Sequence, residues 1–152
     1  AWLILQGIET LPLRMQQHMR NTERVVEFLV SQAFVARVGH PMLETHPSHE
    51  LAKRLLPRGA GSVFSFDLKG TREQGKKFIE TLKIFSHLAN VGDCRSLVIH
   101  PASTTHFRLS DEALALAGIT QGTIRLSIGL EDADDLIDDL KRALKAAEKA
   151  GG

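Results

Sequence analysis

The chain has 152 residues, and 43% of them are hydrophobic, which suffices for one sizeable core but not for two ordinary domains. Nineteen lysines and arginines nearly balance eighteen aspartates and glutamates, so the charge predicts no nucleic-acid surface. No stretch reaches the roughly 20 apolar residues of a membrane span, and a single cysteine, Cys94, cannot form an internal disulfide. We expect one cytoplasmic domain with neither a nucleic-acid nor a membrane partner.

Apolar residues at three- and four-residue spacing near the N-terminus predict a long helix over residues 10–32. The stripe consists of Ile8, Leu11, Met15, Met19, Thr22, Val26 and Leu29. Pro12 fits only near the first turn of this helix, so residues 1–9 should form a separate helical turn at an angle. The apolar start has no basic lead and no cleavage site, which indicates a cut edge of a longer chain rather than a signal peptide.

Short strands alternate with helices along the rest of the chain. We expect strands at 34–38, 61–68, 96–99 and 123–128, and helices at 46–56, 71–85, 110–118 and 132–149. Pro47 is expected at the first position of its helix, and Thr71 as the cap of the next one. Few helices are available to cover the sheet, so the pattern predicts a two-layer α/β sandwich whose sheet is open on one face or edge.

Seven histidines raise the question of a metal site. The densest group is His40, His46 and His49 with Glu44 and Glu50. No HExxH or CxxC spacing accompanies it, so structural roles in turns are favoured and no metal is predicted.

Other chemistry-bearing residues also have simpler explanations. His100 and His106 bracket a loop, where a hydrogen bond from the ring to the loop backbone would explain both. Cys94 has no neighbouring base that would make it a catalytic thiol. The acidic run over residues 132–139 is more typical of a solvated helix face than of a calcium loop.

Arg125 interrupts an otherwise apolar strand. By alternation it shares a face with Thr123 and Ser127, opposite Ile124 and Leu126. It could simply point to solvent, or its planar fork of donors could bind a carboxylate through two hydrogen bonds. The spacing alone leaves both interpretations open.

Four stretches, HPSHELAKR, GSVFSFDLKG, NVGDCRSLVIHPASTTH and IRLSIGLED, resemble in order and spacing the C-terminal part of the Cys/Met-metabolism family of pyridoxal-phosphate enzymes. The resemblance runs from about Trp2 to Ala147. It implies the small C-terminal domain of a fold-type I transferase, with a short, mainly antiparallel sheet covered by helices. It also implies a bridging helical segment over residues 1–33 and an α/β domain over residues 34–152.

The same resemblance implies the positions of site residues. Arg125 occupies the position of the family arginine that binds the substrate α-carboxylate, Asn90 the position that helps to hold it, and Thr105 a position bordering the site. The family's Schiff-base lysine lies upstream, so no catalytic residue is expected in this chain. Pyridoxal 5'-phosphate is expected in the full-length enzyme, a homotetramer, and not on this chain alone.

The Asn-Val-Gly-Asp turn and the Ser-Thr-Thr-His ending are most similar to the sulfhydrylase branch of the family. This implies replacement of acetate on an O-acetylhomoserine-type substrate by sulfide or a thiol, which makes homocysteine or methionine, with this chain inactive alone. A cystathionine γ-synthase or a methionine γ-lyase is an alternative within the family. A stand-alone module that binds a partner or a small carboxylate without chemistry is an alternative outside it.

Overall fold

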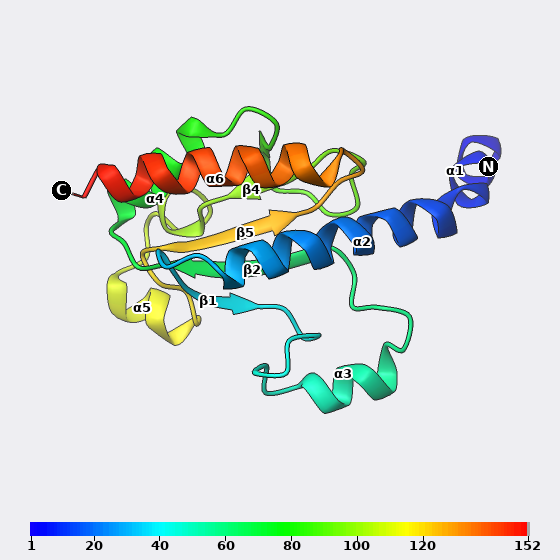
Figure 1. Ribbon diagram of the computed structural model, residues 1–152, viewed down its shortest axis with the longest axis horizontal. Coiled ribbons are helices and arrows are strands. Elements are labelled where there is room, and N and C mark those ends of the chain that lie inside the picture. Colours follow the sequence, from blue (N-terminus) through cyan, green and yellow to red (C-terminus); the bar gives the residue numbers. More distant parts are fainter. Residues whose placement is uncertain (152) are drawn as a thin grey trace.

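The computed structural model describes residues 1–151 and contains a five-stranded sheet with helices packed on one face (Figure 1). The strand order is β1-β2-β5-β4-β3, and the pairs are antiparallel except for the parallel pair β3–β4. The strands are β1 (Val35–Gly39), β2 (Val63–Leu68), β3 (Ser86–His87), β4 (Leu97–Ile99) and β5 (Thr123–Ser127). This mainly antiparallel, two-layer arrangement confirms the predicted fold class.

The core lies between the sheet and three long helices. The helices are α1 (Trp2–Glu9), α2 (Leu11–Val30), α3 (His49–Leu55), α4 (Arg72–Thr81), α5 (Asp111–Leu116) and α6 (Ala133–Lys149), with a 3₁₀ helix at Pro101–Ser103. Apolar residues of α2, α4 and α6 pack on alternate residues of β2 and β5. The rings of Phe66 and Phe78 pack edge to face, with 5.8 Å between their centroids. Burying each such side chain stabilises the fold by about 1.5–3 kcal/mol.

The N-terminal helices are separated as Pro12 predicts. α1 ends at Glu9 and α2 begins at Leu11, and Figure 1 shows α1 set at an angle at the far end of α2. The C-terminal half of α2 is buried against the body, whereas α1 buries no residue. The division of the chain at residue 33 stays a prediction. None of the described helices is long and apolar enough to cross a membrane.

The predicted end of α4 and the predicted exposure of Asp139 were both wrong. Thr71 caps α4 as expected, but the helix stops at Thr81, four residues before Phe85. Asp139 on α6 is only 1% exposed, and its carboxylate accepts the backbone N–H groups of Lys83 and Ile84 at 2.8–3.1 Å. These bonds hold a bend over residues 83–85, after which the chain enters β3, a strand that the sequence pattern did not indicate.

The predicted start of α3 was also wrong. Pro47 lies before the helix, which begins at His49 after Ser48. Residues 41–48 form consecutive turns instead, because the backbone N–H of His46 bonds to the carbonyl of Leu43, and the ring of His46 accepts the N–H of Ser48. Proline fits these turns as well as a first helical turn.

Each predicted strand differs from the observed one by one or two residues at an end, and two of these differences have a local reason. β2 starts at Val63 rather than residue 61, because Gly61 has a φ of +82°, which lies outside the strand region. β1 runs through Gly39, which was expected to end it, because Gly39 still pairs with Ser65.

Candidate functional site

The face of the sheet opposite the core carries polar residues at alternate positions. Ile124, Leu126 and Ile128 are fully buried in the core, and Arg125 lies between them on the other face, as alternation predicts. The strand register places Arg125 between Ser65 of β2 and Ile99 of β4. Arg125 is therefore fixed on a central strand with a neighbour on each side.

Arg125 is half-buried, and its guanidinium makes a single hydrogen bond. Its Nη2 atom donates to the backbone carbonyl of Asn90 at 3.3 Å. Within residues 1–151 no carboxylate pairs with Arg125 and no second hydrogen bond occupies it. The group thus presents a positive charge and free donors, which is what capture of an external carboxylate requires.

Asn90 and Arg125 meet through the Asn90 backbone. The Asn90 side chain is exposed, and its Oδ1 atom accepts the N–H of Val91 at 2.8 Å, which closes its own turn. Thr105 lies apart from both in an exposed turn, where its hydroxyl hydrogen bonds to the His106 ring at 2.8 Å. The structure therefore brings Asn90 and Arg125 together and leaves out Thr105, whose role stays a prediction.

A cleft too narrow to hold a water molecule lies between Arg125 and the segment that follows β3, so a carboxylate can enter it only if that segment moves. Its lining consists of Leu88, Ala89, Asn90, Leu97, Val98, Ile99, Arg125 and Ser127. Most of these side chains are apolar, so the guanidinium is the charged group of the cleft. A cation at the edge of an apolar cleft interacts more strongly with an anion than one in open water does.

The carboxylate of Glu131 anchors the segment that contains Asn90 through hydrogen bonds. It accepts the backbone N–H and the hydroxyl of Ser96, at 2.7 and 2.8 Å, where the segment enters β4. The Ser96 hydroxyl accepts the N–H of Gly129 at 2.8 Å, and Asn21 of α2 donates to the carbonyls of Gly129 and Glu131. Sequence reasoning missed this support, although Ser96 and Glu131 lie in two of the matched motifs.

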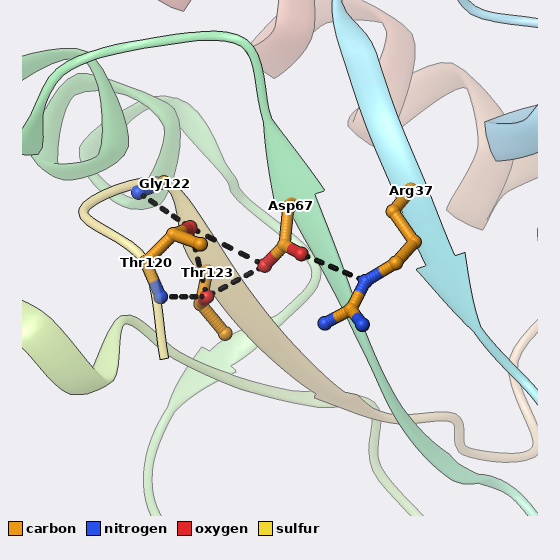
Figure 2. A network of polar contacts seen from close by, with 5 residues as sticks. All are labelled: Arg37, Asp67, Thr120, Gly122 and Thr123. Carbon is orange, nitrogen blue, oxygen red and sulfur yellow. Dashed lines mark hydrogen bonds and ion pairs between the residues drawn. The ribbon is translucent and has the colours of Figure 1, made fainter. Parts of the chain in front are cut away.

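A second polar network stands at the neighbouring edge of the same face (Figure 2). The Asp67 carboxylate, 9% exposed, accepts from the Arg37 guanidinium at 3.0 Å and from the Thr123 hydroxyl at 2.6 Å. The Thr120 hydroxyl donates to Asp67 and accepts from the N–H of Gly122. Asp67 is thus saturated with partners, and its role is to fix the turn that leads into β5.

The histidines occupy structural positions. His100 is fully buried, and its Nε2 and Nδ1 atoms bond to the carbonyl of Gln121 and the hydroxyl of Ser103, both at 2.8 Å. Burial lowers the pKa of His100 below its ordinary value, although the bond to Gln121 opposes the shift. The expected bonds from both rings to the backbone of this loop were wrong. Within the loop His100 bonds to the Ser103 hydroxyl and His106 to the Thr105 hydroxyl, and the backbone partner of His100, Gln121, lies outside the loop.

The histidines of the dense group around residues 40–50 make local contacts. His40 stacks edge to face on Phe64, and His49 bonds to the carbonyl of Pro41. Among the described residues, no group of three potential ligands is close enough to hold a metal ion.

The fold and motifs recur in known proteins. The model of the Cys/Met metabolism PLP-dependent enzyme family matches residues 1–145. The O-acetyl-L-homoserine sulfhydrylase of Leptospira meyeri is 49% identical over 146 residues, which are 95% of this chain and 33% of that protein. The chain thus spans about a third of the length of the curated relatives it matches.

Solved structures agree along nearly the whole chain. A structure described as an O-acetylhomoserine (thiol)-lyase from Campylobacter jejuni, which holds a pyridoxyl-lysine, has a TM-score of 0.87 and 46% identity, covering 95% of this chain and 34% of that one. Cystathionine gamma synthase from Xanthomonas oryzae pv. oryzae, in complex with cystathionine, has the same TM-score and 41% identity, with coverages of 95% and 37%. The chain belongs to the Cys/Met metabolism family of PLP-dependent enzymes, as its motifs indicated.

Proposed function

We propose that this chain supplies the clamp for the substrate α-carboxylate in an O-acetylhomoserine sulfhydrylase, with Arg125 and Asn90 as its parts. The observation that carries the proposal is the Arg125 guanidinium, which stands in a cleft on a rigid strand without a carboxylate partner among the described residues. Its two parallel N–H groups fit the two oxygens of a carboxylate. Charge and geometry together would orient the substrate for the reaction.

Asn90 has a supporting role in the proposal. Its carbonyl holds Arg125 in place before substrate binds, and its side-chain amide has N–H donors that the turn does not use. Thr105 is proposed to border the site, although it is not part of the cleft. The reaction is replacement of acetate by sulfide or a thiol at the γ carbon, which yields homocysteine or methionine.

The residues of this chain do not fit the role of cofactor anchor. Seven of its eight lysines are exposed, and the eighth, Lys76, pairs with Glu73 on α4 at 2.6 Å. None of them lines the cleft beside Arg125. Pyridoxal phosphate, held by another part of the full-length enzyme, would supply the electron sink for the reaction. The contribution of this chain is substrate binding and orientation.

Residues 1–33 would bridge to a cofactor domain, and the full-length enzyme would form a homotetramer. Trp2, Leu3, Ile4 and Leu5 are 60–77% exposed. This apolar surface favours a helix α1 that packs against another part of the full-length protein, because a stand-alone module would have a polar surface there.

A cystathionine γ-synthase is the second candidate, because its solved structure matches the fold with the same TM-score as that of the thiol-lyase. Product analysis separates the two functions. The full-length protein that carries this chain is incubated with pyridoxal phosphate, O-acetylhomoserine and either sulfide or cysteine. Homocysteine formed efficiently from sulfide supports the sulfhydrylase. Preferential cystathionine formation from cysteine supports the synthase, and no turnover with either donor contradicts both.

A further inference from the structure

The hydroxyl of Ser127 is a buried polar group without a hydrogen-bond partner. Ser127 is 3% exposed, and among the described residues it is one of two whose buried side-chain polar atom bonds to nothing. Native proteins rarely leave a buried hydroxyl unpaired, because it has lost its water and gained no replacement. A partner that arrives in another state of the protein would explain an unpaired donor at this position.

Ser127 lies in the same cleft as the proposed clamp. It stands two residues after Arg125 on β5 and on the same face, and both residues line the cleft with Asn90. Cross-strand pairing with Leu97 fixes its backbone on one side and pairing with Val63 on the other. The serine itself therefore cannot move far, and any change of partner must come from the covering segment or from a ligand.

The covering segment is loosely held at this point. Residues 88–90 are exposed, and apart from the bond from Arg125, no loop or turn hydrogen bond involves the backbone of Ala89 or Asn90 in the described chain. The Asn90 carbonyl thus depends on a single donor. If a carboxylate attracts the guanidinium, this carbonyl loses that donor at the moment when Arg125 gains a stronger acceptor.

We propose that Ser127 is a positioning residue of the clamp, whose hydroxyl donates to the Asn90 carbonyl when a substrate carboxylate takes Arg125 away from it. This exchange leaves neither the carbonyl nor the hydroxyl unpaired, and it holds residues 88–90 over the bound carboxylate. Ser127 does not contact the substrate and acts through Asn90. The inference rests on the proposed function, because it requires Arg125 to bind the carboxylate.

The test compares Ser127→Ala with the wild type in the full-length enzyme. L-Norvaline, an amino acid without a γ-leaving group, serves as an unreactive probe of carboxylate binding, and its inhibition constant is measured together with kcat and the melting temperature. We expect the inhibition constant and KM for O-acetylhomoserine to rise about fivefold, which is the usual effect of losing one hydrogen bond. The value of kcat should change less than twofold. The melting temperature of the free enzyme should stay level or rise, because alanine removes an unpaired hydroxyl.

Two further variants make the outcomes distinguishable. Ser65→Ala is the matched control, because Ser65 pairs with Arg125 across the strands and lies outside the cleft. It should leave the inhibition constant, KM, kcat and the melting temperature unchanged. An unchanged inhibition constant in Ser127→Ala, with a clear increase in Arg125→Ala, would overturn the role of Ser127 and leave the clamp intact. An unchanged constant in Arg125→Ala would overturn the clamp itself. A lower melting temperature in Ser127→Ala would show that the hydroxyl is already paired in the free enzyme, which also overturns the exchange.

Discussion

Arg125 and Asn90, 35 residues apart in the chain, are joined by a 3.3 Å hydrogen bond from the guanidinium to the backbone carbonyl. The bond connects the central strand β5 to the turn after β3 across the open face of the sheet. A neutral carbonyl is a weaker acceptor than a carboxylate, so the arginine is oriented without being neutralised. This combination of a fixed position and an unpaired charge suits a binding site.

Gly129 should be sensitive to replacement by alanine, because a Cβ atom there would lie 2.5 Å from the carbonyl oxygen of Cys94 and from the carbonyl carbon of Arg95. Both contacts are to backbone, so the segment before β4 would have to move. We expect a loss of about 1–3 kcal/mol in the free energy of unfolding and a weaker clamp, since Asn90 belongs to that segment.

Urea denaturation measures the loss of stability, and KM for O-acetylhomoserine in the full-length enzyme measures the clamp. Gly7→Ala is the control, because nothing lies within 4 Å of a Cβ atom at that helical position. It should be neutral or stabilise by up to about 1 kcal/mol. Equal stability of Gly129→Ala and the wild type would contradict the close approach of the Cys94 and Arg95 backbone to Gly129.

Asp139→Ala should destabilise the fold by about 2–3 kcal/mol. The substitution removes the acceptor of the Lys83 and Ile84 N–H groups and of the Arg142 side chain. Chemical denaturation of this variant is compared with that of Asp138→Ala, whose exposed carboxylate lies one position earlier on α6. If the two variants lost the same stability, the buried carboxylate would not be what ends α4.

His100 should make stability fall in mild acid. Burial lowers its folded-state pKa below the ordinary value near 6.5, so the unfolded chain binds the proton more readily. The contribution of neutral His100 is therefore complete above about pH 6.5 and is lost as the pH falls through the folded-state pKa. His40, whose pKa burial also lowers, adds in the same direction.

The measurement is the free energy of unfolding between about pH 7.5 and 5 for the wild type and for His100→Gln. We expect the wild type to lose more stability than the variant over this range. His106→Gln, whose ring bonds to the Thr105 hydroxyl, should follow the wild type. Parallel curves for the wild type and His100→Gln would mean that His100 keeps an ordinary pKa in the folded protein.

Local patterns predicted most of the fold, because they depend on neighbours in the chain. The break at Thr10, the cap at Thr71 and the buried face of β5 all followed from spacing and residue type. The end of α4 did not, because it depends on the carboxylate of Asp139, 56 residues further along the chain. A helical stripe can show which face is apolar, but it cannot show that one acidic residue on the polar side bonds to another segment.

The candidate site, too, could be predicted only in part from the sequence. Alternation placed Arg125 on the open face, and the family motifs named Asn90, but only the strand order brings them into contact. Ser127 carries no signal in the sequence that separates it from any other small strand residue. Only the structure shows that its hydroxyl has no hydrogen-bond partner, because only there is Ser127 buried beside β4 and residues 88–90.

The kinetics of Arg125→Ala in the full-length enzyme test the clamp most directly. We expect KM for O-acetylhomoserine to rise strongly and kcat/KM to fall by an amount worth about 2–5 kcal/mol, because an unpaired carboxylate replaces a charge pair. KM for sulfide should stay near the wild-type value, and Arg37→Ala, which removes one of the partners of Asp67, should leave both KM values unchanged. An Arg125→Ala enzyme with wild-type kcat/KM for O-acetylhomoserine would contradict the account.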